Sequence, residues 1–274
     1  MIRSPKPILK TDEEIELLRA SCQLVSRTFA ELKQHVKAGV NTLHLDKIAE
    51  EFIRDHGAVP AFKNYQPDKD LVPFPGTLCT SLNEEVVHGI PSENVVLKDG
   101  DVISLDCGVI LNEFFGDSAY TFMVGEVKPE VQKLLRVTQE CLALGVAQAK
   151  KGNRIGDISF AVQQHAESNG YGVVRDLVGH GIGRSLHEPP EVPNFGRRGN
   201  GPKIEVGLVI AIEPMINMGK GAVRRGSDGW TILSHDKSPS AHFEHTVAVR
   251  ADGIDILTTF EGIESNTTIG AATL

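Results

Sequence analysis

GDVISLDCGVILNEFFGDSAYTF, residues 100–122, is the stretch that decides the fold. It holds a β-rich run that ends on Asp106 and a second run, residues 118–124, that follows Asp117, so it predicts a long β-hairpin. If the chain turns about residues 111 and 112, Asp106 and Asp117 lie directly opposite each other, where like charges repel across about 4.5–5.5 Å. Two carboxylates that close in an apolar hairpin need a cation or a shared proton. A register that exposes one aspartate near the turn is the alternative, and the hairpin alone leaves both open.

Length and composition limit the class of protein. The chain has 274 residues, enough for one large domain or two fused halves, with 41% apolar and 23% charged residues as in ordinary globular proteins. The net charge of −8 argues against general nucleic-acid binding. We expect neither a signal peptide nor a membrane span, because no apolar run has the required length. The four cysteines form no CxxC pair, which indicates reduced thiols and a cytoplasmic protein.

Apolar spacing predicts helices on both sides of the hairpin. Residues 1–10 form an expected extended arm, followed by a single domain at residues 11–274. Thr11 and Glu14 fit a capping box, which opens a long amphipathic helix that ends near Gly39. The other expected elements are a helix that ends at Gly57, a loop at 58–77, a strand at 78–87, helices at about 129–150 and 156–169, and short strands from residue 171 on.

The helix pairs and the strands repeat, which indicates two related halves at about residues 11–125 and 126–260. In each half a glycine leads, six positions on, to a carboxylate at the end of a β-rich run: Gly100 leads to Asp106, and Gly207 to Glu213. We therefore expect an α+β fold, in which two helix-helix-strand halves pack about a pseudo-twofold axis around a central antiparallel sheet. Chance similarity between short apolar runs is the alternative.

Separate strand and turn positions supply candidate metal ligands. Glu213 ends the apolar run VIAIE, Glu244 lies in AHFEHTVAV, and His180 lies in GHGIG, whose glycines allow close backbone approach. With Asp106 and Asp117 they offer hard oxygen ligands and one nitrogen, which suit two divalent ions better than a structural zinc. Two such ions, bridged by carboxylates, hold a hydroxide and polarise a carbonyl. Each residue alone has a simpler interpretation as a buried carboxylate or core histidine, but the whole set favours the metal pair.

These residues and the motifs around them resemble the type I methionine aminopeptidases. The motifs are NEEVVHGIP, GHGIGRSLHE, IEPM and FEHT, and the resemblance covers residues from about 11 to 259. It implies the pita-bread fold, whose two related halves match the repeat in the sequence. It also implies a dinuclear metal hydrolase, in which metal hydroxide attacks the first peptide bond and removes the initiator methionine from nascent proteins.

The resemblance places the family's metal ligands on the five candidate residues. It implies that Asp106 chelates one ion and His180 the other. Asp117 and Glu244 then bridge both ions. Glu213 binds an ion and also serves as the general base that takes a proton from the attacking water. The cofactor is a pair of divalent ions, and Co, Mn, Fe and Zn all tolerate this ligand set.

The resemblance also implies the substrate-facing residues. The family's two catalytic histidines fall on His88, near the scissile amide and the free amine, and on His187, beside the tetrahedral oxyanion. On chemistry alone, both are also consistent with ordinary turn histidines. The walls of the apolar methionine pocket fall on Tyr65, Phe74, Cys79, Leu186 and Trp230.

The sequence departs from the family pattern at the pocket. Between Tyr65 and Phe74 it encloses QPDKDLVP, a longer stretch than the short turn that is usual there, and Leu186 stands where an aromatic residue is common. The shape of the pocket rim is therefore open. The resemblance is to the short bacterial form, so we expect neither the N-terminal zinc-binding extension nor the helical insertion of other relatives.

Two other interpretations compete with this one. Related enzymes on the same fold cleave X-Pro bonds, usually with an extra N-terminal domain, and a non-catalytic relative would keep the fold as a binding protein, for example at the ribosome. The expected partners are the N-termini of nascent polypeptides and, transiently, the ribosome, with no membrane and no specific nucleic acid. We expect a monomer, although the sequence does not fix the oligomeric state.

Overall fold

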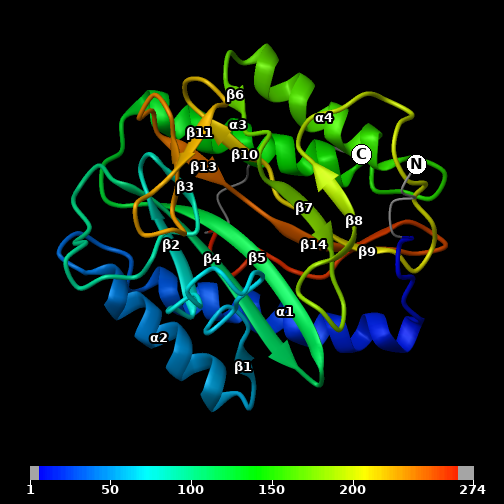
Figure 1. Ribbon diagram of the computed structural model, residues 1–274, viewed down its shortest axis with the longest axis horizontal. Helices are drawn as coiled ribbons and strands as arrows, with labels where there is room; N and C mark the ends of the chain where they lie inside the picture. The colour runs from blue at the N-terminus through cyan, green and yellow to red at the C-terminus, as the bar shows by residue number, and fades with distance from the viewer. Residues whose placement is uncertain (1–5, 265–274) are drawn as a thin grey trace.

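The computed structural model describes residues 6–264 of the chain (Figure 1). Residues 1–5 of the expected arm and residues 265–274 of the expected domain lie outside the described residues. One helix pair lies on each side of a set of strands in the middle of the molecule (Figure 1). The helices are α1 (Asp12–Lys33), α2 (Thr42–Asp55), α3 (Pro129–Val146) and α4 (Ile155–Ser168).

Local sequence sets the helix ends. The capping box expected for α1 is present: the Glu14 backbone N–H donates to Thr11 Oγ1 at 3.2 Å, and the Thr11 N–H donates to the Glu14 carboxylate at 3.1 Å. Asn41 caps α2 through its side chain, which accepts the His44 N–H at 2.9 Å. Gly57 follows the α2 C-cap His56 with a positive φ of 72°, as expected for the residue after a helix. The expectation that α1 ends near Gly39 is wrong, because α1 ends at Lys33 and Gly39 lies in the loop between the two helices.

All paired strands described in the structure are antiparallel. One sheet has the order β1-β4-β2, with β5 beside β4, and a five-stranded sheet has the order β15-β14-β9-β7-β8. Two three-stranded sheets have the orders β13-β10-β6 and β11-β12-β3. The strands are β1 (Val59–Pro60), β2 (Leu78–Leu82), β3 (Glu85–Val87), β4 (Val102–Leu111), β5 (Phe114–Met123), β6 (Gly172–Val173), β7 (Val178–Gly181), β8 (Glu188–Pro193), β9 (Val209–Ile212), β10 (Met215–Asn217), β11 (Val223–Arg225), β12 (Ile232–Ser234), β13 (Ser240–His242), β14 (His245–Val249) and β15 (Ile254–Ile256).

The β4–β5 hairpin turns one residue later than expected. Leu111 pairs with Phe114, so Asn112 and Glu113 form a two-residue turn. Both have positive φ, +52° and +67°. This is the combination that a type I′ turn needs, and its twist matches that of the flanking strands.

The later turn changes the register around the two aspartates. Asp106 pairs with Ala119 and Asp117 pairs with Gly108, so the expectation that the aspartates face each other directly is wrong. They are diagonal neighbours instead. Because the register differs by two positions, both side chains still lie on the same face of the hairpin.

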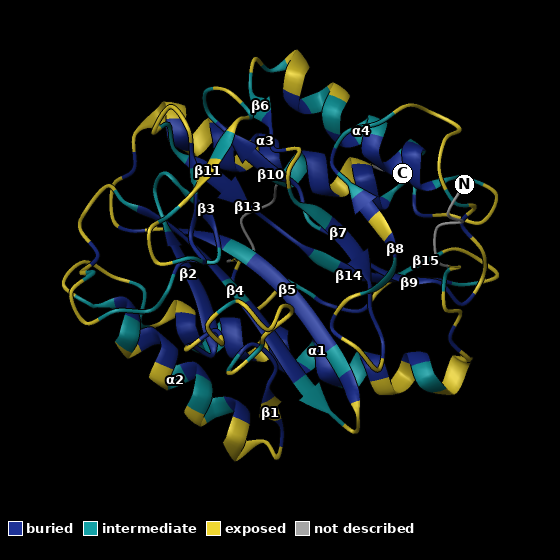
Figure 2. Cartoon of the chain, viewed as in Figure 1, coloured by how far each residue is buried: buried dark blue, intermediate teal, exposed yellow. Residues whose placement is uncertain are grey.

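The apolar core forms two main clusters, one under each helix pair. Phe29, Leu45 and Leu105 belong to the cluster between α1, α2 and β4. Leu134 and Val162 belong to the cluster that α3 and α4 form with the other strands. Figure 2 shows the buried strands between helices whose outer faces are exposed. Within residues 6–264, no helix has the length and apolar character needed to cross a membrane.

Candidate active site

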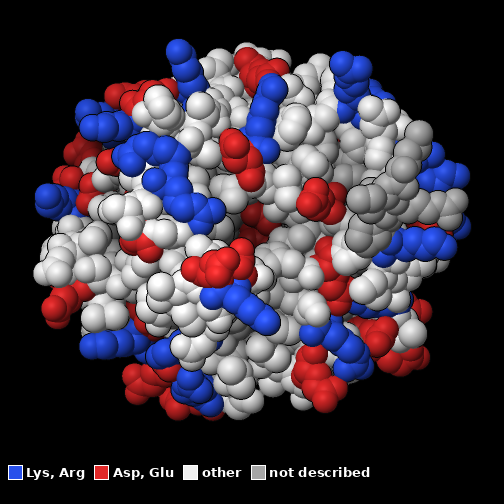
Figure 3. Space-filling view, in the orientation of Figure 1, with Lys and Arg blue, Asp and Glu red and all other residues white. Residues whose placement is uncertain are grey.

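One cleft of about 1370 Å³ brings together every site residue expected from the sequence. The face shown in Figure 3 is hollowed near its middle, and acidic side chains lie in the hollow. The expected residues that line the cleft are Asp106, Asp117, His180, Glu213 and Glu244, the histidines His88 and His187, and Tyr65, Phe74, Cys79, Leu186 and Trp230.

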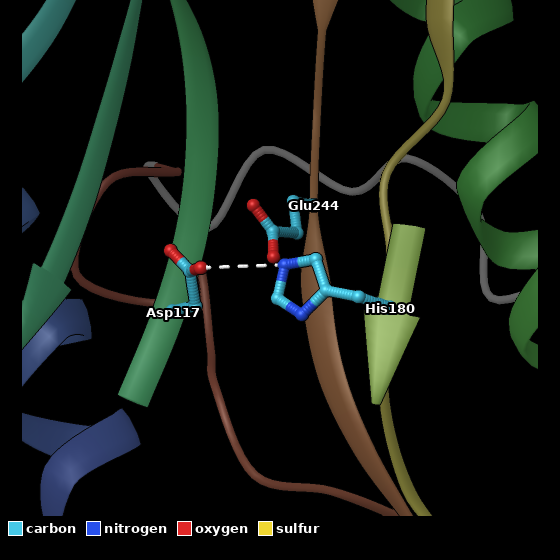
Figure 4. A group of neighbouring side chains, drawn as sticks. All are labelled: Asp117, His180 and Glu244. Atoms are coloured by element: carbon cyan, nitrogen blue, oxygen red, sulfur yellow. Dashed lines mark ion pairs between the residues drawn. The ribbon is translucent and has the colours of Figure 1, made fainter. Parts of the chain in front are cut away.

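Three of these residues form a compact group at the bottom of the cleft. Asp117 of β5, His180 of β7 and Glu244, which lies between β13 and β14, point toward one another (Figure 4). Ligand atoms of all three lie within 4.8 Å of one another, and all three residues are buried. This is the spacing at which one cation could contact all of them.

The two largest sheets are joined at this group. Glu244 forms an isolated bridge to Ala119, with its backbone N–H donating to the Ala119 carbonyl at 2.9 Å. The Ser118 hydroxyl donates to the Glu244 carbonyl at 2.7 Å, and the Thr246 hydroxyl donates to the Asp117 carbonyl at 2.8 Å. These bonds fix the backbone of both carboxylate residues, so their side chains are held facing each other.

His180 is oriented with one nitrogen toward the carboxylates. Its Nδ1 lies 2.9 Å from the Gly181 carbonyl, and because a carbonyl only accepts hydrogen bonds, Nδ1 carries the proton. Nε2 therefore presents a lone pair, 3.7 Å from Asp117 Oδ2 and 3.6 Å from Glu213 Oε1. Both distances are too long for a hydrogen bond, which leaves space for a metal ion between the three groups.

Burial shifts the ionisation of the carboxyl groups. Burial raises the pKa of Asp106 to about 7; His242 opposes the rise and Glu213 adds to it. Burial also raises the pKa of Glu213 to about 8. Burial and then the neighbouring carboxylates hold the pKa values of Asp117 and Glu244 well above the usual range. Without a cation, four buried carboxyl groups therefore repel one another and favour their protonated forms.

The donor set fits divalent metal ions. Oδ1 of Asp106, Oδ1 of Asp117 and Oε1 of Glu244 are buried and have no hydrogen-bond partner among the described residues. Buried carboxylate oxygens without partners are costly unless a cation compensates them. Burial lowers the pKa of His180 to about 3, which keeps it neutral and able to bind metal at physiological pH.

The two candidate catalytic histidines line the same cleft as the carboxylates. The ring of His187 lies 4.3 Å from that of His180, and its Nδ1 lies 2.6 Å from the Tyr65 hydroxyl. His88 has a positive φ of 61° in the turn after β3, and its ring lies 6.2 Å from that of Trp230. Burial lowers the pKa of His88 to about 4, so it is neutral in the cleft.

The turn that carries His88 depends on Gly89. A Cβ at Gly89 would collide with the Thr80 carbonyl. The close approach allows the Gly89 N–H to donate to the Ser81 hydroxyl at 3.1 Å, while the Gly89 carbonyl accepts the Thr80 N–H at 2.8 Å. The turn is thus fastened to β2, whose Cys79 lines the same cleft.

The apolar pocket closes in spite of its longer rim. Phe74, Cys79, Leu186 and Trp230 form one buried cluster, and Tyr65 packs against it. The Phe74 N–H donates to the Tyr65 carbonyl at 2.9 Å. The residues between them therefore form a loop whose two ends are joined by this hydrogen bond. Trp230 Nε1 donates to the carbonyl of residue 72 in that loop at 2.8 Å. The insertion therefore keeps Tyr65 at the rim and ties it to the opposite wall.

Sequence reasoning missed His242. It is 1% exposed, its Nε2 lies 3.6 Å from Glu213 Oε2, and neither ring nitrogen has a partner among the described residues. His242 precedes Glu244 by two positions in AHFEHT. Alternation along a strand puts such residues on one face, so the spacing was the signal that would have found it.

The raised carboxyl pKa values predict how metal-free protein responds to pH. A group whose pKa is higher in the folded than in the unfolded state stabilises the fold below the unfolded value, near pH 4, and loses that contribution as the pH rises through the folded value. For Asp106 the folded value is about 7.

Metal-free protein should therefore lose unfolding free energy between about pH 4 and pH 7 through this group. Urea unfolding at several pH values measures the effect, and Asp106→Asn should show a smaller loss than the parent. Equal slopes would contradict the prediction.

Comparisons with known proteins agree with a metal-binding site in the cleft. The model of metallopeptidase family M24 matches residues 16–251. The methionine aminopeptidase of Clostridium acetobutylicum is 50% identical over 254 residues, covering 93% of this chain and 99% of the relative, and that of Clostridium perfringens is 51% identical over 251 residues, covering 92% and 98%. The crystal structure of methionine aminopeptidase from Rickettsia prowazekii matches with a TM-score of 0.89 at 38% identity, covering 93% of this chain and 100% of that one.

Proposed function

This chain belongs to metallopeptidase family M24, and we propose that the residues gathered in its cleft hydrolyse the first peptide bond of polypeptides that begin with methionine. The chain is a methionine aminopeptidase, a metal-dependent hydrolase that removes N-terminal methionine. The pita-bread fold expected from the sequence is confirmed. The role of each residue is our proposal, and so is the identification of the substrates as nascent proteins that carry the initiator methionine.

One observation supports the proposal most strongly: four carboxylates and one imidazole from separate elements meet in one cleft, with buried oxygens that have no partner among the described residues. We propose that they hold two divalent ions. Asp106 and His180 would each serve one ion, and Asp117 and Glu244 would serve both. When bound, the ions supply Lewis-acid activation of the water and of the scissile carbonyl.

The general base in this scheme is Glu213. Its side chain faces both His180 and His242, each 3.6 Å away, and lies against the cleft rather than in the core. Burial raises the pKa of Glu213 to about 8 in the metal-free protein, so its carboxylate is basic enough to accept a proton from water. It can then pass that proton to the leaving amine, which is the balance that amide hydrolysis requires.

His88 and His187 act on the substrate. Both are neutral at pH 7, because desolvation lowers the pKa of each, so each presents one ring N–H as a donor. We assign His88 to the scissile amide and the free amine, since it adjoins Trp230 at the pocket wall. We assign His187 to the developing oxyanion, since it packs against His180.

The pocket predicts the substrate preference. Its walls are apolar and closed by the loop between Tyr65 and Phe74, so it accepts the unbranched methionine side chain and excludes charged or β-branched ones. Met-Ala, Met-Gly and Met-Ser peptides should be cleaved, and Met-Lys peptides poorly if the cleft narrows at the scissile bond. Comparing kcat/KM across these peptides with Leu-led and Lys-led controls tests the assignment. Equal rates on all would indicate a broad aminopeptidase, and preference for X-Pro peptides would support the competing interpretation.

The functional hypothesis also covers the metal, the assembly and the location of the protein. The metal identity, among Co, Mn, Fe and Zn, stays a prediction, as do the monomeric state and the transient ribosome contact. We propose a cytoplasmic location, because the substrates are new polypeptides and the four cysteines are free thiols in the described structure. The residue ranges of the two related halves also stay a proposal, although the described elements follow the order helix, helix, strands twice along the chain.

A further inference from the structure

A buried ion pair joins the N-terminal arm to the segment that carries His187. Lys10 Nζ donates to Glu188 Oε2 at 2.6 Å, and the two side chains are only 4% and 7% exposed. In every other ion pair that a lysine or arginine makes within residues 6–264, at least one side chain is 25% exposed or more. Burying two charges costs desolvation free energy unless their geometry is good and further hydrogen bonds compensate. This pair therefore differs from the other ion pairs of the described residues.

Both ends of the pair have further partners. The Lys10 ammonium also donates to the Ile8 carbonyl at 2.9 Å. The second oxygen of Glu188 accepts the Ser185 N–H at 3.3 Å, which folds the segment 183–188 back on itself. A Cβ at Gly183 would collide with the Lys10 side chain and with Glu188, so the lysine lies directly against this segment.

The arm is anchored independently of the ion pair. The Lys10 backbone N–H donates to the Gly207 carbonyl at 2.7 Å, and Leu9 forms a bridge to Leu208. Gly207 stands just before β9, the strand that leads to Glu213. The arm is therefore fixed to the sheet that carries the general base, and its ammonium reaches across to the segment that carries His187.

We propose that Lys10 is a positioning residue for His187. It holds the Glu188 carboxylate, and Glu188 adjoins His187 in the chain, so the ion pair sets where the imidazole lies over the scissile bond. Without the ammonium, the buried carboxylate has only the Ser185 N–H left and turns toward water, and the imidazole moves with it. The inference rests on the oxyanion role that we propose for His187.

Lys10→Met tests the proposal. Metal content and KM for a Met-Ala-led peptide should stay near those of the parent, whereas kcat should fall roughly 10-fold to 100-fold, the loss expected from a misplacement of about 1 Å. Arg19→Met is the matched control, because the ion pairs of Arg19 are with Glu16 and Asp255 and not with the segment 183–188, and it should leave kcat unchanged. Unchanged kcat in Lys10→Met, or equal loss in Arg19→Met, overturns the proposal.

A cycle with His187→Ala separates positioning from general destabilisation. If Lys10 acts through His187, Lys10→Met should cause no further loss of kcat in the His187→Ala background, because the group it positions is already missing. Equal factors in both backgrounds overturn the proposal while leaving the role of His187 intact. Full turnover of His187→Ala alone would instead refute that role. If Lys10→Met does not fold, Lys10→Met/Glu188→Gln removes both charges and is measured in the same cycle.

Discussion

Replacing Asp117 by alanine should abolish turnover and tight metal binding together. Asp117 faces His180 and Glu244 in the cleft, and Oδ1 of this aspartate has no partner among the described residues. A bridging ligand contributes to both ions, so its loss should weaken the binding of each. Metal analysis of the purified variant and a Met-Ala peptide assay measure the two losses. In the parent, a chelator should give the same loss of activity, and added Mn or Co should restore it.

A thermal unfolding measurement distinguishes the loss of a metal ligand from the loss of the fold. Burial raises the pKa of Asp117 well above its usual range, so at pH 8 the carboxyl group destabilises metal-free protein. Asp117→Ala should therefore unfold at a similar or higher temperature than the metal-free parent. Asp55→Ala is the matched control, because Asp55 is exposed at the end of α2 and should change neither activity nor metal content. Full activity of metal-stripped parent protein would refute the dinuclear hypothesis.

The hairpin shows what sequence reasoning could and could not reach. The β-rich runs predicted both strands, but Asn112 is compatible with a turn that begins at either of two positions. Only the backbone, with positive φ at both Asn112 and Glu113, selects one. The choice changed the register by two positions, an even number, so the aspartates remained on the same face. Asp106 and Asp117 line one cleft in spite of the incorrect register, because side chains in strands repeat with a period of two.

Local sequence patterns could not predict contacts between segments that are distant in the chain. Lys10 and Glu188 are separated by 178 positions, and neither lies in an apolar run that marks a buried partner. The pairing appears only when the arm docks on Gly207 and the segment 183–188 folds against it. The loop between Tyr65 and Phe74 is similar, since its bond to Trp230 joins two segments that no local pattern connects. Motifs predicted the candidate site residues, whereas packing between distant segments fixes how their side chains are held.

His187→Ala should lower kcat by about 10²–10³, or about 3–4 kcal/mol of transition-state stabilisation, with metal content near normal and KM little changed. The Tyr65 hydroxyl lies 2.6 Å from Nδ1 of His187. When that hydroxyl donates, the ring proton resides on Nε2, which is then free to donate to the substrate. A donor directed at a developing oxyanion acts only in the transition state, so its removal affects kcat rather than the binding of peptide or metal.

The comparison with His180→Ala distinguishes an oxyanion donor from a metal ligand. His180 and His187 are ring neighbours at 4.3 Å, but only His180 directs a lone pair toward Asp117 and Glu213. His180→Ala should therefore lose metal, and its activity should partly return at high metal concentration, whereas His187→Ala should not respond to added metal. If His187→Ala lost metal, the division between ligand and oxyanion donor would be wrong. If it kept full turnover, the donor would be another group, and His88, which lines the same cleft, is the first candidate.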